Sequence, residues 1–461
     1  MTQRSATSVR SGAAHPRAER VPLRIVLAYG PPIFGLSALL FFVQFFFLKF
    51  ATDVLLLAPA TVGVIFALGR AWDAVSDPIA GTWSDRTRTR LGRRRPWMLA
   101  AIPVLGLTFA MIWIPPAALH GTALTVWIGV GLFAFYTAFT AYVIPHLSLG
   151  AELSTDHHDR SRIFGARHAA FTLGIMLAFG GMQFVENSPD PRAAAASLAL
   201  VAIVVLSAVL LIPASLIAER AEYQGRGAQS SFGAMGDVLR NPHARILLFV
   251  VFIEMSGSGV LGILSPYLTV YILKRPDLIG PLPAIFVVFS VISIPFWVRA
   301  SRRFGKRNVW RFAMVGTALS FGSCFFVGEG DVVLICVLLV FAGLSSGCGG
   351  AVGPSMLADV IDYDEYVSGE RKEGAYSAAQ GFAIKAAHAL IILLTGVLLQ
   401  VSGFEPNVEQ GRAAELAIRG LFAGAPFAMF SLAAVVFGRF LLDHREHGRI
   451  RAELDARRAV P

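Results

Sequence analysis

Twelve apolar segments of about 20 residues follow one another along the chain of 461 residues. Their centres fall near residues 38, 70, 106, 133, 173, 206, 258, 290, 318, 345, 389 and 427. As an α-helix, a segment of this length crosses the roughly 30 Å hydrocarbon core of a bilayer. With 55% hydrophobic and 15% charged residues, the chain has too little polar surface for a water-soluble globule. The sequence therefore predicts an all-α membrane protein with twelve transmembrane helices.

Basic residues gather in short loops on one side of the predicted helices. Ser84 to Pro96 contains six arginines, and Val298 to Arg311 contains six basic residues and no acid. On the other side, Ile114 to Leu124 has no Lys, Arg or acid, and Gly328 to Asp331 has acids only. The positive-inside rule then predicts that both termini are cytoplasmic. Because these loops account for much of the net charge of +10, we expect no nucleic-acid partner.

The longest polar stretch between spans, Ala218 to Arg245, divides six helices from six. We predict a tail at 1–24, a six-helix bundle at 25–218, a cytoplasmic loop at 219–243, a second six-helix bundle at 244–441 and a tail at 442–461. The large basic loops follow the second helix of each half, which indicates a weak internal repeat. Such repeats are typical of alternating-access transporters with a site between the halves.

The second apolar segment contains two acids, Asp73 and Asp77, one helical turn apart. Each costs about 2.5–3.5 kcal/mol in a spanning helix, so we expect both to face the bundle interior. Pro78 has no N–H and frees the carbonyl of Ala74 beside them. These oxygens suit a small hard cation, and the same pair can share a proton. The sequence leaves Na⁺, H⁺ and a merely structural acid pair open.

Other charges within predicted spans are candidates for substrate binding or coupling. Lys385 and Arg167 each lie about two turns from the cytoplasmic end of their helices, at the depth of Asp77, so we expect the three to meet. The alternative is that these long side chains snorkel to the interface. Glu254 is a further intramembrane acid, with a coupling role and a structural role equally open. His388 is interpreted as a packing residue.

Two further patterns exclude other kinds of chemistry. Cys324, Cys336 and Cys348 lie in apolar stretches at spacings that fit no zinc or redox motif, so we expect no disulfide. Residues 343–347 match the G-x-S-x-G pattern of serine hydrolases, but a membrane span lacks the strand–turn–helix context that this pattern requires. We predict that the protein is not an enzyme and needs no cofactor beyond a coupling ion.

Three stretches give the chain a family resemblance: WDAVSDPIAGTWSDRTRTRLGRRRPW from Trp72, IPHLSLGAELSTDHHDRSR from Ile144 and ADVIDYDEYVSGERKEGAYSAAQGFAIK from Ala358. The chain resembles the glycoside–pentoside–hexuronide:cation symporters of the major facilitator superfamily, which are related to the sodium-dependent lysophospholipid symporters. The resemblance implies the major facilitator fold of two six-helix bundles. It also implies cation binding by Asp73, Asp77 and Thr140, with Lys385 near that site and Arg167 contacting the substrate.

The chain departs from this family at the sugar site. Galactoside-carrying members have an acid in helix one, whereas Tyr29 to Gln44 has none, and an acid in helix four where this chain has Val143. We predict a symporter coupled to Na⁺ or H⁺ that moves a small organic substrate, a sugar or glycoside, by alternating access. The alternative is a lysophospholipid symporter or flippase of the same fold, and a non-transporting sensor is a further rival.

Charged residues at the cytoplasmic ends are interpreted as an inner gate. In this interpretation the basic loop from Arg86 to Arg95 pairs with the stretch from Asp359 to Arg371. The gate residues are predicted to be Asp85, Arg86, Arg93, Asp359 and Asp362. We expect a monomer in the lipid bilayer of a bacterial cytoplasmic membrane, with a small-molecule substrate and a coupling cation as its partners.

Overall fold

The computed structural model describes residues 22–153, 157–217, 236, 238–370, 372–442 and 444–459, and these residues contain helices but no β-strand. Most of the predicted N-terminal tail and of the predicted central loop lie outside the described residues. The first half comprises α1 (Leu23–Tyr29), α2 (Pro31–Asp53), α3 (Pro59–Arg86), α4 (Arg95–Trp113), α5 (Gly121–Glu152), α6 (His157–Glu186) and α7 (Pro191–Leu216).

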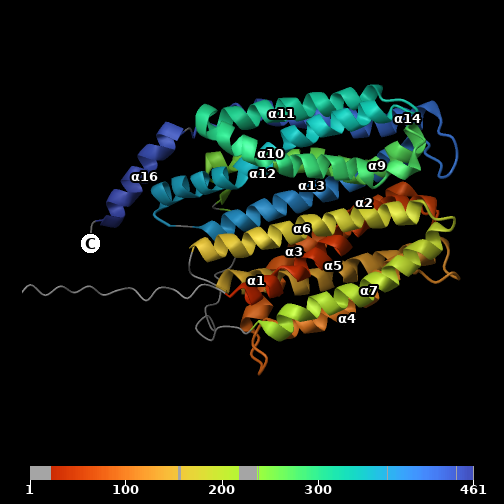
Figure 1. Cartoon of the computed structure of the whole chain (residues 1–461), viewed down its shortest axis with the longest axis horizontal. Helices are drawn as coiled ribbons and strands as arrows, with labels where there is room; N and C mark the ends of the chain where they lie inside the picture. Colours follow the sequence, from red (N-terminus) through yellow and green to blue (C-terminus); the bar gives the residue numbers. More distant parts are fainter. Residues whose placement is uncertain are drawn as a thin grey trace, which may run out of the picture.

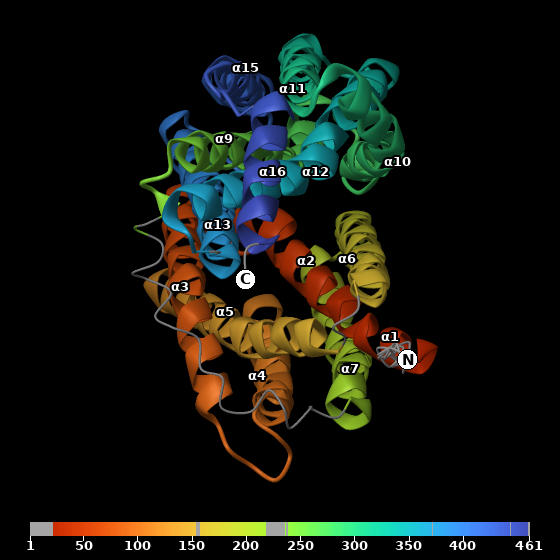
Figure 2. The same ribbon diagram turned by 90° about the vertical axis from the view of Figure 1, so that its left-hand side faces the viewer.

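The second half comprises α9 (Pro242–Tyr267), the π-helix η2 (Leu268–Ile272), the short η3 (Pro276–Leu278), α10 (Pro281–Phe304), α11 (Lys306–Ser323), η4 (Cys324–Phe326), α12 (Val332–Ser368), α13 (Glu373–Val401), α14 (Arg412–Arg419), the π-helix η5 (Gly420–Gly424) and α15 (Ala425–Phe437). A last helix, α16 (His444–Ala459), forms much of the predicted C-terminal tail. Figures 1 and 2 show the two halves as bundles lying against each other.

Eleven helices in the described part of the chain are long and apolar enough to cross a membrane. The predicted twelfth span is α3, which is 28 residues long and so about 40 Å at helical rise. It carries Arg70, Asp73 and Asp77, which explains why composition alone does not select it. Its place in the bundle, packed on α5 and α13, is that of a spanning helix.

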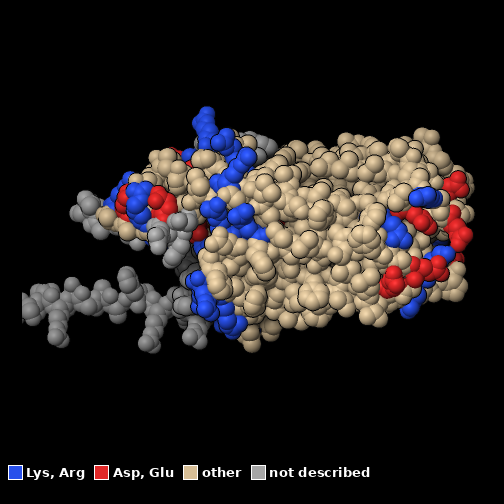
Figure 3. All heavy atoms as spheres, turned by 90° about the horizontal axis from the view of Figure 1, so that it is seen from above, with Lys and Arg blue, Asp and Glu red and all other residues tan. Residues whose placement is uncertain are grey.

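Charged side chains concentrate at the two ends of the molecule, and an uncharged band separates them (Figure 3). One end, called here the basic end, carries the Lys and Arg clusters and α16. The other end, called the acidic end, carries acids mixed with fewer bases. This distribution is that of a protein embedded in a bilayer, because charged side chains avoid the hydrocarbon region.

The buried apolar side chains form two clusters, one shared by both halves and one within the second half. The larger cluster combines the first half with buried residues of segments 260–286, 318–342 and 391–430 of the second half. The smaller one, between Val238 and Leu454, belongs to the second half and includes Ile450 and Leu454 of α16. The apolar core is therefore continuous across the two halves at the acidic end.

Candidate functional site

The two acids predicted to bind a cation meet Thr140 of α5. Thr140 Oγ1 lies 2.9 Å from Asp73 Oδ1 and 3.1 Å from Asp77 Oδ1. The one-turn spacing on α3 puts both carboxylates on the face that packs against α5. The Asp73 side chain is only 2% exposed, whereas that of Asp77 is 28% exposed. Both carboxylates and the hydroxyl thus converge at one point in the bundle.

Two cations compensate this acid pair. Lys385 Nζ, from α13, lies 2.6 Å from Asp77 Oδ2, 3.0 Å from Asp73 Oδ2 and 3.1 Å from the carbonyl oxygen of Asp73. Arg70 Nη1 lies 3.1 Å from Asp73 Oδ2. Two carboxylates facing two cations leave the cluster without net charge, which is the condition for burying it.

Arg70 was not among the residues predicted for the site. Its signal was in the sequence, since it precedes Asp73 by three residues and such pairs meet on a helix surface. Its guanidinium also lies 5.4 Å from the ring centroid of Tyr136, and Arg70 Nη2 lies 3.4 Å from His388 Nδ1. His388, interpreted from the sequence as a packing residue, therefore extends the cluster into the second half.

The acid pair lies where α3 of the first half crosses α13 of the second. Farther along the same two helices, toward the acidic end, the two backbones approach so closely that a Cβ at Gly396 would lie 2.4 Å from the carbonyl oxygen of Pro59, and one at Gly63 would lie 3.1 Å from that of Ile392. Glycine permits this approach because it has no side chain. The ion pairs of Lys385 consequently join the two halves, and a change in these pairs bears directly on how the halves pack.

Carboxylate and hydroxyl oxygens are the ligands that hard cations prefer. Asp73, Asp77 and Thr140 fit a monovalent cation or a proton, since Lys385 and Arg70 already supply two positive charges. Among the described residues, no group of three or more His, Cys, Asp or Glu side chains is arranged to hold a metal ion. These oxygen ligands thus favour an exchange in which a bound cation or proton replaces one of the two positive side chains at the acid pair.

Arg167 and Glu254 lie apart from the acid pair. The Arg167 guanidinium acts electrostatically on Tyr29 and His146, and its buried Nε has no hydrogen-bond partner. Neither carboxylate of the pair bonds to it within the described chain, so the expected meeting of Arg167 with Asp77 and Lys385 is not observed. Glu254 lies inside the second half, where Trp310 Nε1 donates a 2.9 Å hydrogen bond to its carboxylate.

The predicted inner-gate residues all lie at the basic end. Asp85 pairs with Arg94 at 3.1 Å and with Arg93 at 3.8 Å, and Arg86 is the exposed last residue of α3. In the second half, Asp359 Oδ2 lies 2.6 Å from Lys306 Nζ. Asp362 Oδ2 lies 2.9 Å from Arg451 Nη1 and 3.1 Å from His447 Nε2, both on α16. These pairs form within each half, and the gate itself stays a prediction.

A polar network at the acidic end was not predicted. Lys49 Nζ lies 3.1 Å from Asp53 Oδ2 and 3.0 Å from Glu186. Tyr271 of the second half donates a 2.7 Å hydrogen bond to Asp53, and Asn407 Nδ2 donates a 2.8 Å bond to the Asp53 carbonyl. Thr52 and Tyr267 hydroxyls meet at 3.0 Å. The halves are thus bonded to each other at this end as well as at Lys385.

Two bundles of spanning helices that meet at a compensated charge cluster define a multi-pass membrane transporter. The chain has the major facilitator fold: it superimposes on the crystal structure of a D-xylose–proton symporter with a TM-score of 0.63, at 14% identity, over 91% of this chain and 97% of that one. The model of the MFS/sugar transport protein family matches residues 28–444, and the chain belongs to this family.

Named relatives are similar over most of their length. A glucuronide carrier protein homolog of Escherichia coli is 25% identical over 90% of this chain and 92% of its own. A sodium-dependent lysophosphatidylcholine symporter 1 of Xenopus tropicalis is 24% identical over 87% of this chain and 83% of its own. Both are transporters, which agrees with the prediction that this protein is not an enzyme.

Proposed function

We propose that this protein is a cation-coupled symporter in which Na⁺ or H⁺ binds at Asp73, Asp77 and Thr140. The observation that carries this proposal is the bridge from Lys385 on α13 to both acids on α3. A cation that enters between the carboxylates competes with the Lys385 ammonium, because the cluster already holds two positive charges for two negative ones. Cation binding would then release α13 from α3 and change the balance between conformations.

We further propose that the basic end is cytoplasmic, as the positive-inside rule predicts, and that the network around Asp53 closes the outer side. The continuous apolar core at the acidic end supports this assignment. The bacterial relative supports a location in a bacterial cytoplasmic membrane. In this state the substrate would exchange with the cytoplasm, and opening the outer side would require the bonds of Asp53 to the second half to break.

For the substrate we propose a sugar or glycoside that carries an anionic group. Arg167 supports this choice, since it is a cation without an ion-pair partner among the described residues, beside Tyr29 and His146. An arginine matches carboxylate, sulfate and phosphate groups in charge and geometry. The name of the glucuronide carrier relative agrees with such a substrate.

A lysophospholipid is the second candidate substrate. The stretch Tyr29 to Gln44 contains no acid to bind sugar hydroxyls, and the Xenopus relative is named for lysophosphatidylcholine. Uptake of a labelled glucuronide and of a labelled lysophospholipid by the same proteoliposomes separates the two candidates. Arg167→Gln should reduce uptake of either anion-bearing substrate, while it leaves the response to the coupling cation in place.

The proposal of cation coupling is tested by thermal unfolding of the purified protein without substrate. Wild type and Asp77→Asn are compared in NaCl and KCl at equal ionic strength and at several pH values. A rise in Tm that is specific to Na⁺ and absent from the variant would support a Na⁺ site. At a Na⁺ concentration of 100 times Kd, binding stabilises the folded protein by about 2.7 kcal/mol. A pH response that requires Asp77 would support H⁺ instead. Identical behaviour of both proteins in every condition would refute the site.

A further inference from the structure

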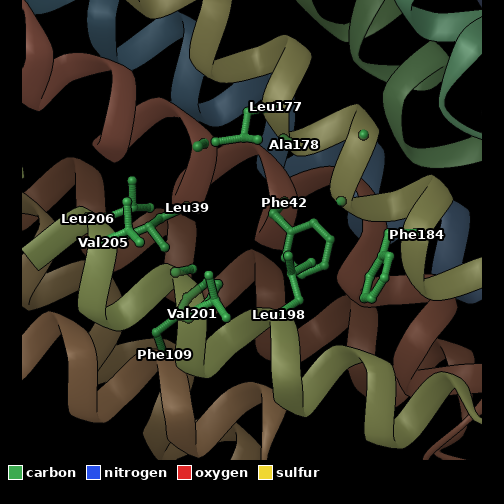
Figure 4. A pocket seen from close by; sticks show the side chains of 14 residues that line it. Leu39, Phe42, Phe109, Leu177, Ala178, Phe184, Leu198, Val201, Val205 and Leu206 are labelled. Carbon is green, nitrogen blue, oxygen red and sulfur yellow. The ribbon is translucent and has the colours of Figure 1, made fainter.

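An apolar groove runs along the outside of the first half, between α6 and α7, with α2 at its floor (Figure 4). Its volume is about 380 Å³, and all fourteen lining residues are apolar or glycine. Large side chains border it, among them Phe42, Phe184 and Val201. Small residues create the hollow, and Gly180 on α6 has no atom within 4 Å of where its Cβ would lie.

The groove opens toward the hydrocarbon of the membrane. The side chains at its border are strongly exposed: Leu177 by 47%, Phe184 by 54%, Val201 by 60% and Val205 by 52%. They belong to the apolar spans Arg162–Glu186 and Pro191–Pro213, around which the solvent is lipid. Water does not fill such a space, because the walls offer it no hydrogen-bond partner. Hydrocarbon chains are the solvent that can occupy it.

A polar cavity of about 370 Å³ lies toward the acidic end of the same three helices, and Asn407 of the second half also lines it. On α2 the lining passes from Phe42 in the groove to Phe46 in the cavity, and on α6 from Phe184 to Glu186. The cavity therefore follows the groove along α2 and α6, about one helical turn nearer the acidic end. An apolar section at membrane depth followed by a charged section at the interface matches the two parts of a phospholipid.

The charges of the polar cavity select one kind of headgroup. Its lining contains three acids, Asp53, Glu186 and Asp190, and two bases, Lys49 and Arg192. Three negative charges against two positive ones give a net charge of −1. Lys49 already pairs with Asp53 and Glu186, so a cationic group is favoured near Asp190, and phosphate is favoured near Arg192. One nitrogen of Arg192 donates to the carbonyl of Pro115 at 3.2 Å, and an arginine has five N–H donors.

We propose that this groove and cavity form a binding site for a zwitterionic phospholipid with a primary ammonium headgroup. An acyl chain of a lipid in the leaflet at the acidic end lies in the groove between α6 and α7. Its phosphate faces Arg192, and its ammonium faces Asp190. The groove lies on the outside of the first half, the polar cavity also includes Asn407 of the second half, and neither part includes the acid pair.

The acyl chain is tested with Gly180→Leu, which places a side chain in the groove at a position where a Cβ meets no atom within 4 Å. Gly165→Leu is the matched control, since it lies on the same helix, also has open space around its Cβ and does not line the groove. The full-length protein is reconstituted with phosphatidylethanolamine, washed in detergent and analysed by native mass spectrometry. We expect one retained lipid in wild type and in the control, and at least tenfold less in Gly180→Leu. Equal retention in all three proteins would overturn the proposal.

The headgroup is tested by competition between phosphatidylethanolamine and phosphatidylcholine of the same chain length. We expect wild type to prefer the ethanolamine lipid at least fivefold, because a primary ammonium donates hydrogen bonds to carboxylates and a quaternary one does not. Asp190→Asn keeps an acceptor for Ala193 N at the start of α7 but removes the charge, so it should reduce this preference. No preference in wild type would overturn the headgroup assignment.

A transported lysophospholipid is the other possible source of an acyl chain. If Gly180→Leu abolished lysophospholipid uptake while phosphatidylethanolamine retention stayed at the wild-type level, the groove would be a substrate path and the proposal would be wrong. We expect the reverse, with retention lost and the Na⁺ or pH response of thermal unfolding unchanged. That response depends on Asp77, so failure of the lipid site and failure of the cation site are distinguished.

Discussion

The ammonium nitrogen of Lys385 lies 2.6 Å from a carboxylate oxygen of Asp77, and this contact joins the two halves of the molecule. The same two helices, α3 and α13, also touch through Gly63 and Gly396 toward the acidic end, so the pair belongs to a closely packed contact between the halves. Exchange of the Lys385 ammonium for another cation therefore also changes a contact between the two halves. This coupling of charge to packing is the physical basis of the predictions that follow.

Lys385→Gln should lower stability in K⁺ medium, because it leaves two carboxylates with Arg70 as their remaining cation. Breaking a buried ion pair lowers the free energy of unfolding by about 3–5 kcal/mol. We expect a loss near the lower end of this range, because the Asp77 side chain is partly exposed. A proton or Na⁺ should restore part of the loss. Denaturant or thermal unfolding in NaCl and KCl measures both effects, with Lys274→Gln, an exposed lysine outside the acid pair, as the control. Equal stability of Lys385→Gln and wild type in KCl would contradict this account.

Arg70→Gln should tighten cation binding although it destabilises the protein without cation. The guanidinium lies 3.1 Å from Asp73, so its removal leaves a net negative charge at the site. We expect the midpoint of the Na⁺ or H⁺ titration to fall to an at least tenfold lower concentration. A tenfold change corresponds to about 1.4 kcal/mol of binding free energy. Arg70→Lys keeps the charge and serves as the comparison. An unchanged or weaker midpoint in Arg70→Gln would show that Arg70 does not act on the site through its charge.

The sequence largely predicts which residues of a single helix belong to the candidate site. It predicts only some of the contacts between helices that are distant in the sequence. The one-turn spacing of Asp73 and Asp77 and the charge of Lys385 within a span pointed to the acid pair. Thr140 came from family resemblance alone. The position of Arg167 beside Tyr29 and His146 depends on how α6 is rotated in the bundle, and neither helix depth nor hydropathy specifies that rotation.

The network at the acidic end could not be predicted for a related reason. Lys49, Asp53 and Glu186 lie near the ends of apolar segments, where charges are expected to face water. Their meeting with Tyr271 requires the relative placement of the two halves, which no local pattern in the chain encodes. Likewise, α16 was interpreted as part of a tail, because two buried apolar residues, Ile450 and Leu454, do not stand out among the charges of that segment.

Thr140→Val should weaken cation binding while it preserves the shape of the side chain. The hydroxyl lies within hydrogen-bond distance of both carboxylates, and a hydrogen bond to a charged group contributes about 1.5–3 kcal/mol. We expect at least a tenfold loss of affinity for the coupling cation, read from the titration of Tm. Thr140→Ser keeps the hydroxyl and should stay within threefold of wild type. A loss of equal size in both variants would assign the effect to packing instead.

Glu254→Gln should leave the cation response intact, because Glu254 lies in the interior of the second half and bonds to Trp310. Its side-chain amide oxygen can still accept the hydrogen bond from Trp310 Nε1, so the loss of stability should stay below about 1 kcal/mol. Glu254→Ala removes the acceptor and leaves a cavity, with an expected cost of about 2–3 kcal/mol. The Na⁺ or H⁺ midpoint is measured for both variants. A shift of that midpoint in Glu254→Gln would make Glu254 part of the coupling site.

Tyr271→Phe should favour opening at the acidic end. Its hydroxyl donates a 2.7 Å hydrogen bond to Asp53, and this bond connects the second half to the first. Since a bond to a charged group contributes about 1.5–3 kcal/mol, its loss should raise the open population at least tenfold. Spin labels on the exposed residues Ala118 and Glu329, one in each half, report the separation by electron–electron double resonance. Tyr363→Phe at the basic end is the control, and an unchanged distance distribution in Tyr271→Phe would show that Asp53 does not hold the halves together.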